Sequence, residues 1–351
     1  MFAWNHWYVA ALSAEITATP LGRTILGEPV VLYRLADGRP VALADRCPHR
    51  RYPLSLGCLD GDHLVCGYHG FAFDAEGRCV AVPGQAHVPA RANVASYPLV
   101  EQGAWAWIFM GDAGRADEVE IPPTPWLTEP GWAVLSGMAP LRARVELLID
   151  NLLDLSHETY LHAGFIGTPE VARTPIDSSV GDDGVVRVWR HMDAVACPPF
   201  YAASTGLSGA VDRWQDIEYF APGFYLLHAR IARAGLAPGG DDAGAFHMKI
   251  LYGLTPSTDS ATYDFWALAR DFAIDDAEVD RFLEAMQVAV VRQDVDALDV
   301  LEQRVRDDPD AFEVSVRSDR GGLAARRAYA AACAAPARTE APHDVPALAK
   351  R

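Results

Sequence analysis

The feature that most constrains this chain is a pair of short motifs that each join one cysteine to one histidine. The first motif is Cys47-x-His49, and the second, Cys66-x-x-His69, follows after sixteen intervening residues. Strand-like segments flank both motifs, so each cysteine and its histidine are expected to project from one tight loop, the first stiffened by Pro48. Two such loops facing each other would gather two thiolates and two imidazoles around one centre.

This mixed ligand set favours a Rieske-type [2Fe–2S] cluster. In such a cluster two cysteines hold one iron and two histidines hold the other, which raises the reduction potential above that of an all-cysteine cluster. A single zinc ion is the alternative, but zinc fingers pair cysteine with cysteine and histidine with histidine. The sequence therefore predicts that Cys47, His49, Cys66 and His69 bind a [2Fe–2S] cluster.

A second motif, Asp154-x-x-His157-x-x-x-x-His162, suggests a mononuclear iron site. Iron(II) sites that activate O₂ use two histidines and one carboxylate and leave other coordination positions open. Side chains five residues apart diverge by about 140° on an ideal helix, so joint binding by His157 and His162 predicts a helix end or a distortion near residues 158–162. Asp154 is expected to accept a hydrogen bond from the ring nitrogen of His157 that does not bind metal. Alone, the motif could equally be a pair of ordinary core or surface histidines.

The third ligand is predicted to be Asp294, on a long helix expected over about 276–307. The apolar face of that helix includes Val290 and Ala297, and Asp294 lies on the same line between them. A buried carboxylate is costly unless it is paired or bound to a metal, and a buried aspartate–arginine pair is the alternative. Gln293 is assigned to the polar face of the helix, away from the metal.

Composition narrows the class of protein. The chain has 351 residues, of which 50% are hydrophobic and 22% charged, and its formal net charge is −17. This charge argues against nucleic acid or an anionic membrane as a partner. The N-terminus lacks the pattern of a signal peptide, and no run of 18 apolar residues predicts a transmembrane helix. A cytoplasmic location is expected, where the six cysteines would be thiols or metal ligands rather than disulfides.

The pattern of strands and helices predicts an α+β protein with two domains. Short strands separated by turns continue to Met110 and favour an all-β domain over residues 1–115, before a boundary rich in Pro and acidic residues. A second domain is expected over residues 116–335, and residues 336–351 are expected to form a disordered tail. In the second domain we expect a helix from about Val145, strands near 185–192, 214–220, 224–231, 246–254 and 261–269, and the long helix already described.

With these motifs in place, the chain resembles the vanillate O-demethylase oxygenase group of Rieske non-haem iron oxygenases over nearly its whole length. The resemblance rests on Cys-Pro-His-Arg50, Cys-Gly-Tyr-His-Gly70, Val82-Pro-Gly-Gln85, the segment 150–162, Val211-Asp-Arg-Trp214 and the acidic helix around Asp294. Two departures are visible. Phe71 stands where many Rieske proteins carry Trp, which is expected to affect only packing, and Gln293 stands where relatives often have an acid.

The resemblance implies an all-β Rieske domain followed by a helix-grip-like catalytic domain, an antiparallel sheet with a long C-terminal helix. It also implies a homotrimer in which Asp154 bridges His157 to His69 of the partner subunit. A ferredoxin-type flavin reductase would deliver electrons from NAD(P)H. Neither the assembly nor the reductase follows from composition or spacing.

The expected reaction is O-demethylation of a methoxylated, vanillate-like aromatic acid by O₂, giving a phenol and formaldehyde. The alternatives are hydroxylation of an aryl methyl group or a ring carbon, and an electron-transfer-only Rieske protein, which would need only about the first 110 residues. His228 and Arg230, on one side of a predicted strand, and Tyr252 on a neighbouring strand are candidate substrate contacts. An arginine would suit a carboxylate, although a solvent-facing side of the strand is an equal alternative.

Overall fold

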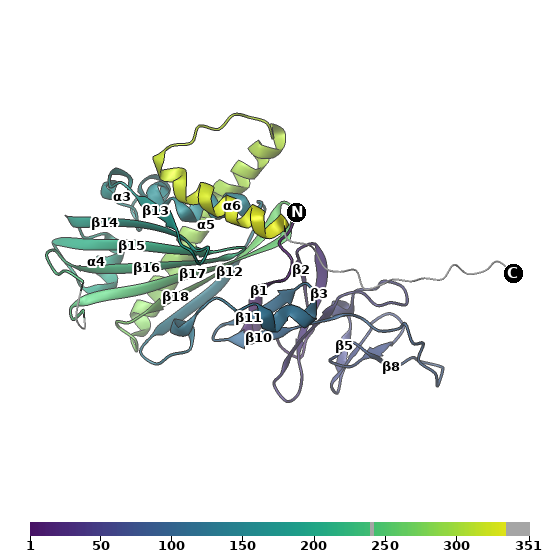
Figure 1. Ribbon diagram of the computed structural model, residues 1–351. Helices are drawn as coiled ribbons and strands as arrows, with labels where there is room; N and C mark the ends of the chain where they lie inside the picture. Colours follow the sequence, from purple (N-terminus) through teal and green to yellow (C-terminus); the bar gives the residue numbers. More distant parts are fainter. Residues whose placement is uncertain (239–241, 335–351) are drawn as a thin grey trace.

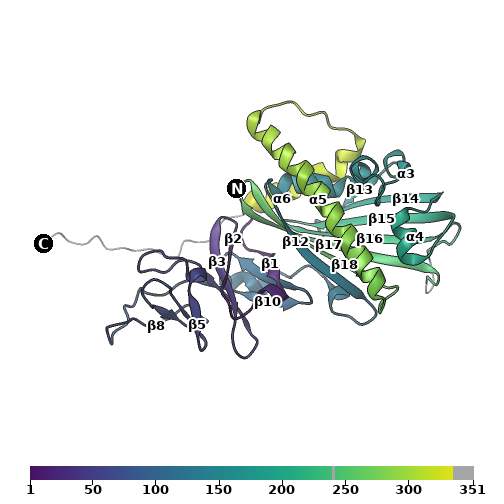
Figure 2. The same cartoon turned by 180° about the vertical axis from the view of Figure 1, so that it is seen from behind.

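The protein consists of an all-β N-terminal lobe and a larger lobe in which helices cover a single sheet (Figure 1). The computed structural model describes residues 1–238 and 242–334. Figures 1 and 2 place the strands β5 and β8 at the opposite end of the molecule from the helices α3 and α4. The predicted tail, residues 336–351, lies outside the described residues.

The N-terminal lobe contains three small antiparallel sheets, ordered β1-β11-β10, β2-β3-β4-β9 and β5-β6-β7-β8. Its strands are β1 (His6–Leu12), β2 (Leu21–Ile25), β3 (Glu28–Arg34), β4 (Pro40–Ala44), β5 (Cys58–Asp60), β6 (His63–Val65), β7 (Ala72–Phe73), β8 (Cys79–Ala81), β9 (Ser96–Tyr97), β10 (Leu99–Gln102) and β11 (Trp105–Met110). Its helical turns are the 3₁₀ segments η1 (Ser13–Glu15), η2 (Leu54–Leu56), η3 (Ala113–Glu118) and η4 (Pro125–Leu127). The prediction of an all-β region up to Met110 is confirmed.

The larger lobe is built on a seven-stranded antiparallel sheet of order β12-β18-β17-β16-β15-β14-β13. The strands are β12 (Ala133–Leu141), β13 (Asp177–Val180), β14 (Val186–Ala196), β15 (Ala210–Phe220), β16 (Phe224–Arg233), β17 (Ala245–Thr258) and β18 (Ala261–Arg270). The helices are α1 (Val145–Leu153), η5 (Leu155–His157), α2 (Glu158–Leu161), α3 (Pro169–Arg173), α4 (Pro199–Thr205), α5 (Ala277–Asp307), η6 (Arg317–Asp319) and α6 (Arg320–Ala334).

The long helix α5 crosses one face of this sheet and closes the core of the lobe (Figure 2). Its first residue follows Asp276, whose carboxylate accepts hydrogen bonds from the N–H groups of Glu278 and Val279, as an N-terminal cap does. Its buried side includes Leu283, Val290 and Leu298. An antiparallel sheet covered by this helix confirms the predicted fold class and the helix predicted over 276–307.

Several elements of the larger lobe were not predicted, namely β12, β13, α3, α4 and α6. Strand β12 contains Gly137 and Pro140, residues that usually argue against a strand. It is an edge strand, paired only with β18, so Pro140 interrupts no ladder on its free side. The buried residues of α6 include Gly321, Gly322 and Ala324, which form no strong apolar pattern.

A mixed cluster of side chains joins the two lobes. Val9 and Trp107 from the N-terminal lobe pack with Phe224, Leu251 and Phe265 from the large sheet. These residues occupy the sheet face opposite the helices, because their strand neighbours, such as Tyr252 on β17, face α5. The division predicted between residues 115 and 116 stays a prediction. None of the helices in the described ranges is long and apolar enough to span a bilayer.

Candidate metal centres

The two Cys/His loops of the N-terminal lobe have matching backbone geometry. In each loop the cysteine N–H donates to the carbonyl five residues later (2.9 Å for Cys47, 2.8 Å for Cys66). Each cysteine carbonyl also accepts from the N–H four residues later, at 2.8 Å from Arg51 and 3.0 Å from Gly70. Both Arg51 and Gly70 have positive φ, 60° and 71°, so the two loops turn in the same way and present equivalent side chains.

These loops bury the thiols and expose the imidazoles. Cys47 and Cys66 are buried, whereas His49 and His69 are exposed with ring centroids 4.6 Å apart. Burial raises the pKa of the Cys47 thiol to about 11, and the adjacent Cys66 contributes to the shift. Two buried sulfurs beneath two surface imidazoles fit a [2Fe–2S] cluster that exchanges electrons at the surface.

The same geometry disfavours a single zinc ion. Ligand atoms bound to one zinc at 2.0–2.3 Å must lie within about 4.6 Å of each other. Within the described part of the chain, three His, Cys, Asp or Glu ligand atoms come within 4.8 Å of one another only at His157, His162 and Asp294. No three of the four cluster residues meet that limit.

Phe71 lies against the candidate cluster ligands. Its ring stacks on His49 with centroids 4.9 Å apart and an interplanar angle of 12°. This stacking is the kind of packing role that was expected of the departure, and it places the ring directly against a candidate ligand.

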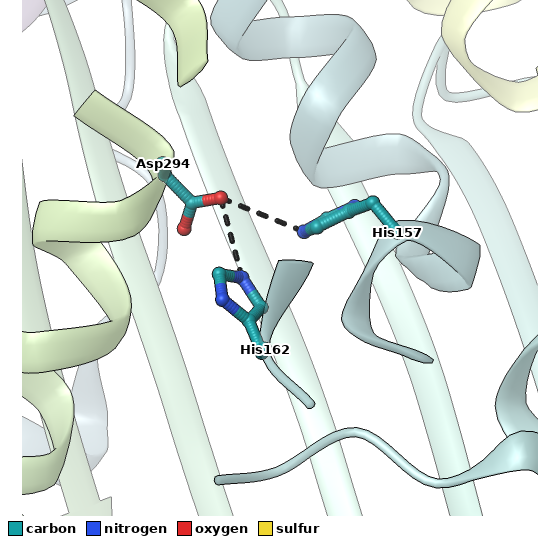
Figure 3. Close-up of side chains that lie close together, drawn as sticks. All are labelled: His157, His162 and Asp294. Carbon is teal, nitrogen blue, oxygen red and sulfur yellow. Dashed lines mark ion pairs between the residues drawn. The ribbon is translucent and has the colours of Figure 1, made fainter. Parts of the chain in front are cut away.

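His157, His162 and Asp294 converge from separate elements onto one point (Figure 3). Asp294 Oδ1 lies 3.6 Å from His157 Nε2 and 3.3 Å from His162 Nε2. Asp294 comes from α5, whereas the two histidines follow α1. His162 is 1% exposed and Asp294 is 8% exposed, so the three side chains could hold one iron ion in a largely buried site.

The backbone between the two histidines departs from a regular helix, as predicted. Helix α1 ends at Leu153, η5 covers Leu155–His157, and the four-residue helix α2 ends before His162. His162 itself has φ −103° and ψ 27°, outside the helical region. This interruption lets two side chains that are five residues apart point to the same place.

Asp154 contacts His157 differently from the prediction. The acceptor for His157 Nδ1 is the backbone carbonyl of Asp154, at 2.8 Å. The Asp154 carboxylate instead accepts hydrogen bonds from the N–H and the hydroxyl of Ser156, at 2.9 and 2.6 Å. The carboxylate thus caps η5 while the carbonyl orients the imidazole.

Gln293 belongs to the site, contrary to its assignment to the polar face. His162 Nδ1 lies 2.8 Å from Gln293 Oε1, which leaves Nε2 free to point at Asp294. Asn151 on α1 also donates to Asp294 Oδ1 at 3.1 Å. Sequence reasoning missed both contacts, because neither residue belongs to a metal-binding motif.

The electrostatics of the site favour a cation. Burial alone would lower the pKa of His162, but the hydrogen bond and charge of Asp294, with Gln293, raise it above its ordinary value. A buried carboxylate that stabilises a proton on this imidazole would stabilise a metal ion at the same position. Two imidazoles and one carboxylate are the donor set of non-haem iron(II) sites.

Two of the three candidate substrate contacts lie on the wrong face of the sheet. Gln215 on β15 bonds to Glu158 of α2, so its neighbour Trp214 faces away from the helices. Arg230 is paired with Trp214 and lies 4.1 Å from its ring. The Nε and Nη2 atoms of Arg230 donate to the two carboxylate oxygens of Asp242, at 2.6 and 2.5 Å. Arg230 is therefore not a contact of the iron site.

His228 shares this outer face and binds Lys249 at 2.8 Å and Glu218 at 3.3 Å. Tyr252 lies on the inner face, where its hydroxyl accepts a hydrogen bond from Gln287 of α5 at 3.0 Å. Alternation along the strand correctly placed His228 and Arg230 together, but not on the side that faces the iron site. Tyr252 stays a candidate.

A surface groove of about 920 Å³ reaches the site from outside. Its walls come from α1, α5 and the segment that joins α5 to α6, and His157 and Asp154 lie among its lining residues. One side of the iron site is therefore accessible from the surface of the protein.

Comparison with known proteins agrees with this geometry. Residues 6–98 match the model of the Rieske [2Fe-2S] domain, and residues 141–335 match that of the vanillate O-demethylase oxygenase C-terminal domain. The chain is 36% identical to the vanillate O-demethylase oxygenase subunit of Pseudomonas sp. (strain HR199 / DSM 7063), covering 93% of this chain and 94% of the relative. It is 33% identical to the iron-sulfur subunit of the toluene-4-sulfonate monooxygenase system of Comamonas testosteroni, covering 92% and 94%.

The solved structure of dicamba monooxygenase with non-heme iron and dicamba superposes with a TM-score of 0.81, at 33% identity over 94% of this chain and 97% of that one. The matched models and relatives agree with a [2Fe–2S] cluster and a mononuclear iron as cofactors. The chain belongs to the vanillate O-demethylase oxygenase family of Rieske non-haem iron oxygenases, and it is the oxygenase component of a multi-component monooxygenase.

Proposed function

We propose that this protein O-demethylates a methoxylated aromatic acid similar to vanillate. One oxygen atom of O₂ is inserted into a methyl C–H bond, and the other leaves as water with two electrons and two protons. The hydroxylated ether is a hemiacetal that releases formaldehyde and leaves a phenol. The observation that carries this proposal is the His157, His162 and Asp294 site in a chain 36% identical to a vanillate O-demethylase oxygenase subunit.

We assign Cys47, His49, Cys66 and His69 to the [2Fe–2S] cluster and His157, His162 and Asp294 to the iron. When bound, the two groups supply single electrons and activation of O₂. The chain fixes their geometry. The Asp154 carbonyl and the Gln293 amide each accept a hydrogen bond from one imidazole, which holds both Nε2 atoms toward Asp294.

The inner face of the sheet offers an apolar wall for an aromatic substrate. The inner face of β16 and β17 carries Leu227, Ala229, Met248 and Ile250. Such apolar walls suit an aromatic ring and protect a reactive centre from unproductive proton and electron loss. Tyr252 offers one hydroxyl at this face. Of the three substrate contacts predicted from the sequence, it is the one that still can orient the substrate.

We further propose a homotrimer in which the cluster of one subunit serves the iron of the next. His69 is exposed at the far lobe, and the groove that contains Asp154 and His157 opens to the surface. Asp154 would link the two centres, with its backbone carbonyl on His157 and its carboxylate facing His69 of the partner subunit. Because the relatives are named as components of oxygenase systems, a reductase is needed, and we propose a ferredoxin-type flavin reductase that uses NAD(P)H.

The test is turnover of a panel of methoxybenzoates, vanillate included, by the purified protein with a reductase, NADH and O₂. We expect one formaldehyde and one phenol for each substrate consumed. Asp154→Asn keeps an oxygen that can accept from Ser156, so the variant should retain iron. Because it removes the charge proposed to face the partner subunit, its rate should fall roughly 10- to 100-fold. Turnover of other aromatics without formaldehyde from any aryl ether would refute O-demethylation.

Hydroxylation of an aryl methyl group is the second candidate, since one relative belongs to a toluene-4-sulfonate monooxygenase system. Assays with methylbenzoates and toluenesulfonate distinguish it, because the product is then a benzylic alcohol and no formaldehyde forms. An electron-transfer-only role does not explain why residues 141–335 match an oxygenase catalytic domain.

A further inference from the structure

Two arginines without carboxylate partners are buried on the inner face of the large sheet. Arg190 on β14 and Arg213 on β15 are each 3% exposed. The register pairs Arg190 with Gln215, and Arg213 is two residues from Gln215 on the same strand, so the arginines are diagonal neighbours about 7–8 Å apart at Cα. Because residues two apart on a strand share a face, both point toward the helices.

This pair lies beside the candidate iron site. The Gln215 amide donates to both carboxylate oxygens of Glu158, at 3.1 and 3.2 Å. Glu158 directly follows His157 in the chain and is itself buried. A small cavity lined by Leu155, Ile217, Gln215 and Arg190 lies between this segment and the sheet.

Among the described residues, neither arginine of this pair has a carboxylate in direct contact. Over the described ranges, no carboxylate oxygen lies within 4.0 Å of either guanidinium, in contrast to buried Arg230 and Arg270, which pair with Asp242 and Asp280. Arg190 donates one hydrogen bond, to the Thr174 carbonyl at 3.1 Å. Nη1 of Arg213 is buried with no hydrogen-bond acceptor, and the Arg213 guanidinium stands 5.3 Å from the Tyr201 ring.

A buried cation with unused donors requires an anion to compensate it. Glu158 and Asp154 act on Arg190 through space, but Gln215 donates to both oxygens of Glu158 and Ser156 donates to Asp154, so neither carboxylate bonds directly to a guanidinium. An ionised carboxylate presents two oxygen acceptors and a sulfonate presents three. Either group can therefore accept hydrogen bonds from the N–H donors of an arginine.

We propose that Arg213 and Arg190 bind the anionic group of the aromatic substrate and so select carboxylates or sulfonates over neutral aromatics. This inference rests on the proposed function, since it assigns the acid group of that substrate a binding site. The two arginines replace Arg230 as the candidate contact for the acid group, because Arg230 lies on the outer face of the sheet. The ring would then extend from the arginines toward His157 and His162.

The experiment measures binding by calorimetry, with the intact, metal-loaded protein and without turnover. The probes are 4-methoxybenzoate, 4-methoxybenzenesulfonate and the neutral 4-methoxybenzamide. We expect wild-type protein to bind at least one anion more tightly than the amide by roughly 10- to 100-fold, the effect of one charge-assisted hydrogen bond. Arg213→Gln should remove this preference while leaving amide affinity within about twofold.

Arg187→Gln is the matched control. Arg187 lies on β14 three residues from Arg190, so its side chain projects from the opposite face, where it pairs with Asp183 and Glu218. We expect its anion preference to equal that of the wild type. The anion that binds more tightly shows whether the site prefers a carboxylate or a sulfonate.

Three results would overturn the inference. The wild type could bind anions and the amide equally, which decides the matter even if Arg213→Gln does not fold. Arg213→Gln could keep the full preference, or it could lose anion and amide affinity to the same extent. None of these depends on formaldehyde release, so failure of the proposed reaction would be recognised separately.

Discussion

At the scale of single residues, Asp294 is the side chain on which the iron site depends most. Its Oδ1 atom lies between both imidazoles and also accepts from Asn151. Asp294→Ala removes the only carboxylate of the triad, so we expect iron content to fall by about one in three atoms per chain while acid-labile sulfide is unchanged. Metal analysis and the EPR signal of the reduced cluster measure the two separately.

Asp296→Ala is the control for this change, because Asp296 lies on the same helix but pairs with Arg292 on the exposed side. It should keep all of its iron. Full iron retention in Asp294→Ala would mean that another residue completes the site.

Gln293 provides a second prediction at this scale. Since its amide oxygen fixes His162 by accepting from Nδ1, Gln293→Leu should weaken iron binding about 10- to 100-fold. Gln293→Glu keeps an acceptor and should restore most of the affinity. Competition with a chelator measures the iron affinity. Equal loss in both variants would show that the side-chain volume matters rather than the hydrogen bond.

At the scale of elements, the position of α5 against α1 sets the distance between Asp294 and the histidines. Glu302 on α5 accepts from the Arg144 guanidinium at 2.7 and 2.9 Å and from its backbone N–H at 3.1 Å, immediately before α1 begins. Arg306 adds a contact at 2.9 Å. The Glu302 side chain is 2% exposed whereas that of Arg144 is 34% exposed, so this pair joins the two helices at the edge of the core.

We therefore expect Glu302→Gln to lower the free energy of unfolding by about 2–3 kcal/mol at neutral pH. Burial alone would raise the pKa of Glu302, but hydrogen bonds from Arg144 and Arg306 lower it to about 2. A carboxyl whose pKa is lowered in the folded protein stabilises it above the unfolded pKa, near 4.5. This stabilisation is lost as the pH falls from 4.5 toward 2.

Chemical denaturation at pH 7 and pH 3 checks this prediction. The difference between wild type and Glu302→Gln should shrink to less than half at pH 3. Glu284→Gln, an exposed site on the same helix, should change stability little at either pH. A difference that does not depend on pH would contradict the ionic origin of the contact.

At the scale of the whole molecule, the exposed cluster ligands and the iron site belong to different lobes (Figure 1). In the proposed trimer, electrons pass between subunits. Mixed trimers made from His69→Ala and Asp294→Ala subunits should then recover activity, because an intact cluster can face an intact iron site. Each variant alone should be inactive.

Formaldehyde release by the mixed sample, together with a mass near three times 38.1 kDa by ultracentrifugation, tests this arrangement. Inactive mixtures that have exchanged subunits would place electron transfer within one chain. A monomeric but active wild type would exclude the trimer.

The sequence by itself determined the chemistry, because metal ligands are recognised by residue type and spacing along a short stretch. Cys47, His49, Cys66 and His69 lie in two local loops, and the break between His157 and His162 follows from their separation of five residues. Asp294 was found from helical periodicity alone, and the structure brings it to both histidines.

Tertiary structure decided what spacing cannot express. Alternation placed His228 and Arg230 on one side of β16, but only the packing of α2 and α5 determines which side is the inner one. Gln293 is one residue from Asp294, about 100° around the helix, yet its side chain reaches His162 because α5 packs directly against that segment. Side-chain type is local information, whereas the face that becomes interior depends on contacts between distant parts of the chain.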